Sequence, residues 1–404
     1  PRRKLMLALG LIYNIGWLVL FKYAGFFRDN LAALWGLLSR QTVSARSWEL
    51  LLPLGISFYT FQCLSYLLDV YHERVQPERS LTRMALYISL FPKLTAGPLT
   101  SYRAISGQLQ ERQVSWERAE HGAKLFVLGL GFKVLLANRI GSLWSDISAI
   151  GFEGISTPLA WMGAFAYSFQ IYFDFYGYSL MALGLGQLLG FDLPENFADP
   201  YLSRSMTEFW RRWHITLGGW FRDYVYIPLG GNRRGPWRQL LNLLIVWSLT
   251  GLWHGAEWTF VLWGLYYFLL LAGERFLWGK AIARLGPLRH LYALFFINAG
   301  WVLFRAESVS KAGGVLRAML GGAPLSDGRT TYYLLEYGWV LALAVVAALP
   351  WKRWLEQWLQ ARQQRPLPRI LLLWWPRLAA LGLLVLSYMQ LLTSTFNPFI
   401  YFRF

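Results

Sequence analysis

Long apolar runs separated by short polar segments dominate this chain. The runs cover residues 5–27, 50–70, 121–140, 159–189, 239–253, 258–271, 290–304, 332–349 and 370–392. Most of them reach or approach the roughly 20 residues that a membrane-spanning helix needs. The pattern therefore predicts an all-α, polytopic membrane protein, with one domain over residues 1–404.

The segment 203–223 is amphipathic instead of uniformly apolar. Ser205 followed by Glu208 is a capping-box signature, which predicts that a helix begins at Met206. Large apolar residues then recur at helical spacing on one face: Met206, Phe209, Trp210, Trp213, Leu217, Trp220 and Phe221. The opposite face carries Glu208, Arg212, Gly219 and Asp223. A spanning helix could not hide so many charges, so we expect this helix to lie in or near the membrane interface.

His214 falls at the rim of the apolar face of this predicted helix. Helical spacing places it in one stripe with Thr207, Arg211, Gly218 and Arg222. Two arginines and a histidine on one line predict an anion site. The alternative is a rim histidine that merely occupies the lipid headgroup zone.

His254 follows the apolar run 239–253. Gly251 and Gly255 bracket it, so the run can bend or break there and let another backbone or a ligand approach the ring. A histidine at membrane depth is costly and is a functional-site hypothesis by default. Because an unperturbed imidazole accepts a proton near neutral pH, we expect His254 to be a catalytic base in a cavity wall shared with Trp253. The alternative is a structural histidine bonded to a neighbouring carbonyl.

Polar residues also enter the run 159–189. Gln170, Asp174 and Tyr178 are spaced by four and share one helix face, which places a carboxylate inside an aromatic-rich span. Asp174 can orient a catalytic ring, bind a polar substrate or pair with an arginine of a neighbouring helix. The spacing alone leaves these three roles open.

The charge distribution indicates a membrane as the partner of this basic chain. The net charge is +17, yet charged residues make up only 15% and hydrophobic residues 55%. The basic residues gather between the apolar runs, at 74–83, 103–118, 204–238, 275–289 and 352–369, as the positive-inside rule expects of cytoplasmic loops. No nucleic-acid-binding motif accompanies the charge, so we expect membrane lipid and no nucleic acid. Not all these loops can be cytoplasmic if every run spans, so some runs are expected to be re-entrant or interfacial.

Cysteine and histidine usage narrows the chemistry. Cys63 is the only cysteine, so neither an intramolecular disulfide nor a cysteine-rich metal site is possible. No HExxH motif or closely spaced histidine pair is present, and the sequence predicts no metal site. The chain begins with Pro1 and shows no signal peptide with a cleavage site, which is consistent with a fragment of a longer membrane protein.

Motifs spread over most of the chain resemble those of one family. They are LPLGISFYTFQ at 52–62, FPKLTAGP at 91–98, YFDFYGYS at 172–179, ENFADPY at 195–201, EFWRRWH at 208–214, RDYVYIPLGGNR at 222–233, GLWHG at 251–255, GWVLFRA at 300–306 and PFIYFRF at 398–404. In these residues the chain closely resembles the membrane-bound O-acyltransferase family. The most similar branch is the bacterial one that includes alginate O-acetyltransferase, peptidoglycan O-acetyltransferase and the teichoic-acid D-alanylation protein.

The resemblance implies a helical fold wrapped around a funnel, with re-entrant and interfacial helices that reconcile the crowded positive loops. It equates His254 with the family's invariant histidine and His214 with its second histidine. The chain departs from relatives at Lys93, where histidine is frequent, and at Tyr176 and Leu180, where serine and aspartate are more usual. Relatives also begin with further hydrophobic helices, which this chain is expected to lack.

The implied reaction is acyl transfer, with acetyl-CoA as the expected donor and no bound cofactor. His254 would take the proton of the acceptor hydroxyl, while His214 and Arg211 position or stabilise the donor. Four further residues complete the expected substrate and donor site: Arg222, Asp174, Trp210 and Trp253.

The acetyl group is expected to cross the bacterial inner membrane from a cytoplasmic donor to an extracytoplasmic polysaccharide such as alginate. Peptidoglycan, another envelope polymer or D-alanyl transfer are the alternatives. Because the polymer is too large for a funnel between helices, we expect a periplasmic or membrane-anchored relay protein with a catalytic serine. A transporter would instead show paired broken helices in two related halves, and a scaffold would need no histidine at depth.

Overall fold

The computed structural model describes residues 2–40, 51–151, 154–350 and 366–393, together with Trp354, Leu355, Gln357, Trp358 and Ala361. These residues form helices and, apart from one isolated bridge, no β-structure, which confirms the predicted all-α class. The motif at 398–404 and part of the basic segment 352–369 lie outside the described residues.

The helices follow one another through the whole described chain. The first half contains α1 (Arg2–Leu18), η1 (Val19–Tyr23), α2 (Ala24–Ser39), α3 (Ile56–Tyr71), α4 (Leu81–Ser89), η2 (Phe91–Lys93), α5 (Tyr102–Gln110), α6 (Trp116–Gly131), η3 (Phe132–Ala137), α7 (Asn138–Ile150) and α8 (Thr157–Leu188). The second half contains η4 (Pro200–Leu202), α9 (Met206–Arg212), α10 (Ile215–Phe221), η5 (Arg222–Tyr226), α11 (Pro236–His254), α12 (Trp258–Phe276), α13 (Gly279–Arg284), η6 (Gly286–Leu288), α14 (Arg289–Arg305), α15 (Val309–Met319), α16 (Gly328–Ala348) and α18 (Pro366–Thr393).

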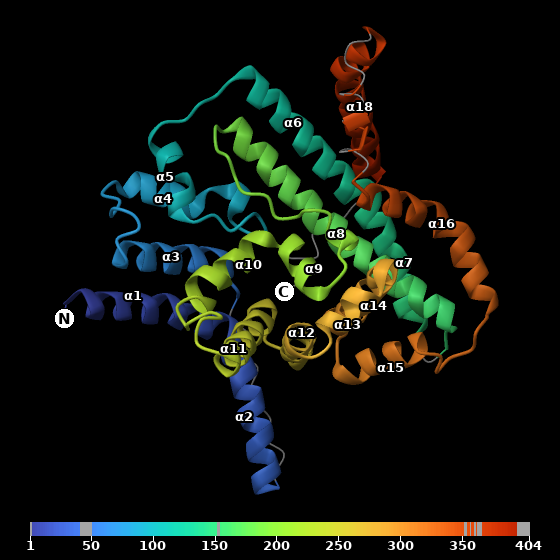
Figure 1. Ribbon diagram of the computed structural model, residues 1–404, viewed down its shortest axis with the longest axis horizontal. Helices are drawn as coiled ribbons and strands as arrows, with labels where there is room; N and C mark the ends of the chain where they lie inside the picture. Colours follow the sequence, from blue (N-terminus) through green and yellow to red (C-terminus); the bar gives the residue numbers. More distant parts are fainter. Residues whose placement is uncertain are drawn as a thin grey trace.

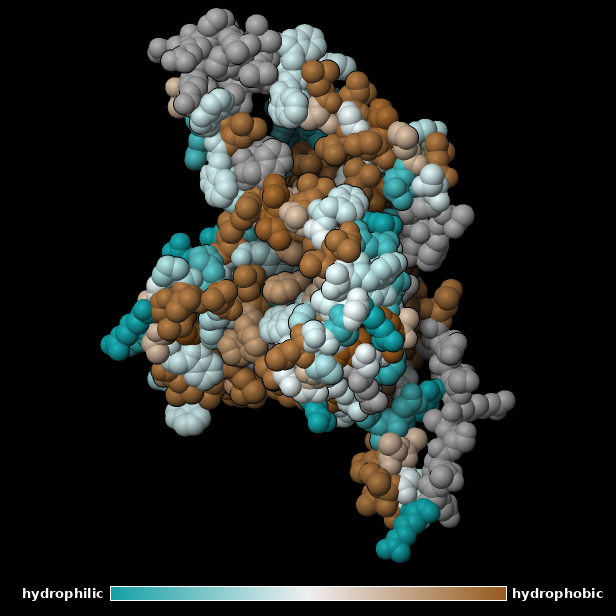
Figure 2. All heavy atoms as spheres, turned by 90° about the vertical axis from the view of Figure 1, so that its right-hand side faces the viewer, coloured by the Kyte–Doolittle hydropathy of each residue, from teal (hydrophilic) through white to brown (hydrophobic). Residues whose placement is uncertain are grey.

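Four helical segments of the described chain are long and apolar enough to cross a membrane. They are residues 2–39, residues 116–150, helix α16 and residues 374–393 of α18. Many large side chains of the first segment and of α16 are exposed, as at Leu31 (65%) and Leu335 (80%), and Figure 2 shows hydrophobic side chains over much of the face that includes α16. Apolar surfaces of this extent need lipid around them, so the protein is a membrane protein.

Fewer runs are both long and apolar enough to span a membrane than the sequence pattern predicts. The run 50–70 forms the 16-residue helix α3, and the runs 239–253 and 258–271 form the 19-residue helices α11 and α12. Each of these helices buries part of its surface against other helices. The apolar composition of these runs therefore serves the protein interior as well as the lipid.

Glycine pairs bring α6 and α8 into direct backbone contact, and Figure 1 shows the two helices side by side. A Cβ on Gly129 would lie 2.4 Å from the carbonyl oxygen of Gly177, and one on Gly184 would lie 2.4 Å from that of Gly122. Small residues at helix crossings allow such close approach in membranes. The contact fixes α8, which carries Asp174, against α6.

The segment after α8 returns to the middle of the molecule, where α9 and α10 lie between α8 and the pair α11 and α12 (Figure 1). Helix α9 begins at Met206 as predicted, because the Ser205 hydroxyl accepts a hydrogen bond from the Glu208 amide at 3.1 Å. A carboxylate of α12 closes the same end: Glu274 accepts a bond from the Met206 amide at 2.6 Å. Orphan amides at a helix N-terminus need such acceptors.

The prediction of a single helix from Met206 to Asp223 is wrong. Helix α9 ends at Arg212, His214 adopts a left-handed conformation with φ +45°, and α10 begins at Ile215. The chain turns because its backbone pairs with an earlier segment. The Ala198 amide donates to the Arg212 carbonyl, and the Ile215 amide donates to the Asn196 carbonyl, each at 3.0 Å.

Candidate active site

His254 is the last residue of α11, and Gly255 ends the helix. A Cβ on Gly255 would lie 2.2 Å from the ring of Phe260, so glycine is required where the chain turns toward α12. Gly251 serves packing instead, because a Cβ there would lie 2.4 Å from the Phe260 carbonyl oxygen at the crossing of α11 and α12. The run therefore breaks after His254, as the sequence predicts.

Aromatic rings surround the imidazole of His254. Its centroid lies 4.8 Å from that of Trp253, 5.0 Å from that of Trp263 and 5.1 Å from that of Phe304. The residue is 7% exposed. It also borders a cavity of about 180 Å³, which is lined by Lys22, residues 52–58, Thr95, Trp253 and His254. A base in this position can meet a small substrate while most of its surface is shielded from water.

His214 is buried at the break between α9 and α10. Its Nδ1 lies 3.2 Å from Asn196 Oδ1, and its ring lies 4.8 Å from that of Phe175. The same oxygen accepts bonds from the amide and the hydroxyl of Thr216 at 3.2 and 2.7 Å. An amide oxygen can only accept, so this contact assigns a proton to Nδ1 and leaves the lone pair of the neutral ring on Nε2.

The rings of His214 and His254 both lie close to the indole ring of Trp253. The ring centroid of Trp253 lies 6.1 Å from that of His214 and 4.8 Å from that of His254. The start of α10 and the end of α11 therefore converge, and three of the predicted site residues form one buried cluster.

Lys22, which the sequence pattern did not single out, lies beside this cluster. Its Nζ donates to the carbonyl oxygen of Trp253 at 2.5 Å and lies 3.5 Å from that of His254. The hydroxyl of Tyr23 donates to the carbonyl oxygen of Leu252 at 2.8 Å. Because the last carbonyls of a helix have no partner within it, these two side chains cap α11. A lone charge within an apolar run was the available sequence signal.

Arg211 and Arg222 lie outside the cluster. Both side chains are exposed, and Arg222 pairs with Asp223 at 2.7 Å. Because the helix is interrupted at His214, the predicted stripe that joins this histidine to the two arginines on one helical line is wrong. An anion held by these arginines would sit at the surface, away from the buried imidazole.

Asp174 forms an ion pair with Lys133 of η3, and both side chains are buried. Of the three roles left open by the sequence, pairing with a cation of a neighbouring helix is therefore observed, with lysine in place of arginine. The other two members of the predicted face have different surroundings. Gln170 lines a larger cavity, and the Tyr178 hydroxyl bonds to that of Thr95 at 2.6 Å.

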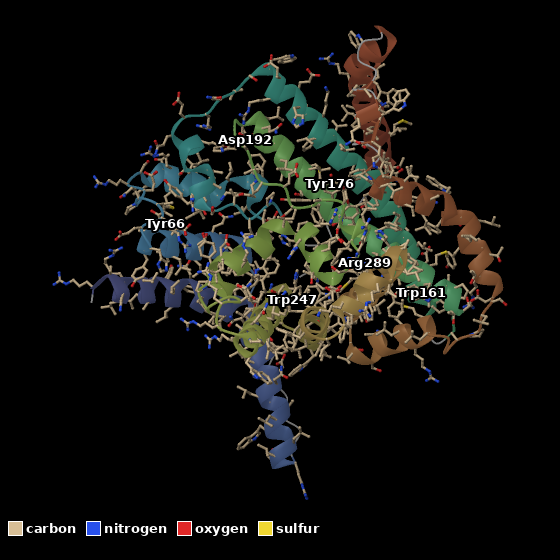
Figure 3. The ribbon with its side chains drawn as sticks, viewed as in Figure 1. Tyr66, Trp161, Tyr176, Asp192, Trp247 and Arg289 are labelled. Carbon is tan, nitrogen blue, oxygen red and sulfur yellow. The ribbon has the colours of Figure 1, made fainter. Side chains whose placement is uncertain are left out.

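Trp210 belongs to an aromatic core between α9, α11 and α12. Its ring centroid lies 4.7 Å from that of Tyr267, 4.8 Å from that of Trp247 and 5.5 Å from that of Trp263. Figure 3 labels Trp247 near the centre of the molecule. Trp263 also contacts the His254 ring, so this aromatic core packs against one side of the histidine.

The larger cavity has a volume of about 1390 Å³ and is bordered by α7, α8, α14, α16 and α18. Charged and polar side chains line it, including Lys133, Asp146, Gln170, Glu257 and Arg305. Phe304 lines the same cavity and packs edge-on against the His254 ring. An aromatic wall therefore separates His254 from this larger space.

Comparison with known proteins identifies the family of this chain. The sequence model of the membrane-bound O-acyltransferase family matches residues 6–309, which include both histidines and the lysine beside them. The chain belongs to this family. The resemblance predicted from the motifs is thereby confirmed, and the protein is an O-acyltransferase.

Relatives of this acyltransferase are similar over most of its length. The probable alginate O-acetylase AlgI of Azotobacter vinelandii is 37% identical, covering 98% of this chain and 84% of the relative. That of Pseudomonas aeruginosa is 39% identical, covering 88% of this chain and 69% of the relative. The peptidoglycan O-acetyltransferase of Helicobacter pylori is 35% identical, covering 79% of this chain and 65% of the relative.

We expect Asn196→Ala to slow acyl transfer by this acyltransferase about 10-fold or more, since a small misplacement of a reacting group can cost about 100-fold. The substitution removes the oxygen that fixes His214 Nδ1. The measurement is the initial rate per amount of folded protein. Asn298→Ala is the control, because Asn298 is an equally buried amide that accepts a bond from the Ser168 hydroxyl. Equal losses in both variants would contradict a role for Asn196 in the site.

Proposed function

We propose that this acyltransferase moves an acetyl group from cytoplasmic acetyl-CoA toward an extracytoplasmic polysaccharide, with alginate as the first candidate. The relatives support this choice, because two that match most of the chain are probable alginate O-acetylases. The observation that carries the proposal is the pair of buried histidines at one indole beside a small cavity. Peptidoglycan is the second candidate acceptor, supported by the Helicobacter pylori relative.

His254 is the general base of the proposed reaction. Its imidazole takes the proton of the acceptor hydroxyl while the hydroxyl oxygen bonds to the carbonyl carbon of the thioester. The tetrahedral intermediate then collapses, the carbon–sulfur bond breaks, and the leaving thiolate takes the proton from the imidazolium. His214, whose Nδ1 is held by Asn196, would use Nε2 to position the donor.

The size of the cavity beside His254 favours a small acyl group. Its volume of about 180 Å³ falls below the roughly 300–1,000 Å³ of sites for drug-sized ligands. An acetyl group and an attacking hydroxyl suit this space, and a long acyl chain does not. A D-alanyl group is also small, and the teichoic acid D-alanyltransferase of Bacillus subtilis is 27% identical over 62% of this chain.

The exposed arginines Arg211 and Arg222 are proposed to bind the phosphates of the donor at the membrane surface. They belong to the basic segment 204–238, and the positive-inside rule places such segments on the cytoplasmic side. Trp210, Trp253 and Asp174 would shape the site without touching those phosphates. In this scheme the protein is a multi-pass protein of the bacterial inner membrane, with lipid around its apolar helices.

His254→Ala is expected to reduce acetyl transfer by about 100- to 10,000-fold, the usual contribution of a general base. Membrane insertion should be unchanged, because the substitution removes a base and leaves the aromatic enclosure in place. The measurement is the O-acetyl content of the polymer together with the yield of detergent-extracted protein. His72→Ala, at an exposed position after α3, is the control. Near-normal acetylation by the His254 variant would exclude this residue as the base.

A polymer cannot enter a cavity of about 180 Å³, so we propose a relay through a periplasmic or membrane-anchored partner with a catalytic serine. In liposomes that contain labelled acetyl-CoA, the protein alone should release little label to external polysaccharide. Adding the partner outside should start the transfer, and a partner whose serine is replaced by alanine should not.

Two results would change this proposal. Efficient acetylation of external polysaccharide by the chain alone would show that no relay is needed. Transfer from a D-alanyl thioester, with none from acetyl-CoA, would replace the acetyl group by D-alanyl.

A further inference from the structure

Lys22 is the single charged residue of the apolar run 5–27. It lies in η1, a π-helical turn between α1 and α2, within a segment long enough to cross a membrane. Local π-helical turns are frequent at functional sites, and an ionisable residue inside a membrane span is expensive to keep. Both features indicate that Lys22 has a function that depends on its charge.

Capping of α11 alone does not require this charge. Tyr23 caps the Leu252 carbonyl with a neutral hydroxyl at 2.8 Å, so a neutral donor is sufficient at this helix end. The Lys22 ammonium makes one short bond, to the Trp253 carbonyl at 2.5 Å, and lies 3.5 Å from both the His254 carbonyl and the Ser57 hydroxyl. An ammonium has three N–H donors, and the two hydrogen bonds at 3.5 Å are long and weak, so they leave donor capacity for a ligand that is a stronger acceptor.

The location of Lys22 indicates which ligand can use that capacity. Lys22 borders the cavity of about 180 Å³ together with His254 and Thr95. Among the described residues that line this cavity, it is the only lysine or arginine. When a hydroxyl attacks a thioester beside a histidine base, negative charge develops on the carbonyl oxygen, and a fixed cation in a water-poor site stabilises it strongly.

We propose that Lys22 is a further catalytic residue, whose ammonium stabilises the oxyanion formed at the acyl carbonyl beside His254. This inference rests on the proposed function of the His254 site. The acceptor oxygen bonds to the carbonyl carbon, His254 takes the hydroxyl proton, and the carbonyl oxygen becomes an oxyanion held by Lys22. When the carbon–sulfur bond breaks, the carbonyl re-forms and the thiolate takes the proton from His254.

The experiment compares three variants with the wild type, each at an equal amount of folded, monodisperse protein. Lys22→Gln keeps a neutral donor for the Trp253 carbonyl and removes the charge. Lys22→Arg keeps the charge. Tyr23→Phe removes the neighbouring cap of the same helix end without changing the charge.

We expect kcat to fall about 100-fold in Lys22→Gln, the usual effect of losing one oxyanion partner. KM for the donor should stay nearly constant, because the interaction is made only in the transition state. Lys22→Arg should recover most of the rate, and Tyr23→Phe should lower kcat far less than Lys22→Gln does, because it removes one cap of α11 and no charge.

Two results would overturn the inference. If Lys22→Gln keeps a kcat near that of the wild type, no charge is needed. If Lys22→Gln and Tyr23→Phe lose rate and thermal stability in parallel, Lys22 is a cap and no more. The assay uses whichever acyl donor the wild-type protein accepts, acetyl-CoA or a D-alanyl thioester. A failure of acetyl-CoA therefore counts against the proposed donor and leaves the comparison of variants in place.

Discussion

The last carbonyl groups of α11 need hydrogen-bond donors from outside their own helix. The geometry of the His254 site depends on the residues that supply these donors. Backbone groups that are shielded from water and left unpaired are costly, above all in a membrane. Lys22 and Tyr23 supply the donors from the N-terminal helix, Lys22 from 231 positions away in the sequence. The same contacts fix the position of His254 and bring a cation to the cavity beside it.

A second backbone contact positions the other histidine. The segment around Asn196 pairs with the chain between α9 and α10, which interrupts the helix and holds His214 in a left-handed conformation. Such a conformation costs about 1–3 kcal/mol in a residue other than glycine. The strain is offset by the contacts of the buried ring, and the break places His214 against Trp253 at the end of α11.

Local patterns predict the helical class, the start of α9, the break after His254 and the family. The features that local patterns do not predict depend on contacts between residues far apart in the sequence. The apolar periodicity of 206–223 continues through His214, so spacing could not reveal that a segment near residue 196 replaces the helical hydrogen bonds. The partner of Asp174 lies 41 positions away, and its role could not be chosen from the face of one helix. Lys22 was missed because its apolar run indicated a span by length alone.

The central claim is that His214 and His254 act as one unit around Trp253. A double-mutant cycle tests it most directly, with transfer rates measured for His214→Ala, His254→Ala and the combined variant at equal amounts of folded protein. Groups that act as a unit are strongly non-additive. If the two histidines act as a unit, the combined variant is about as slow as the slower single variant. If the two losses multiply in the combined variant, the histidines act independently and the account is wrong.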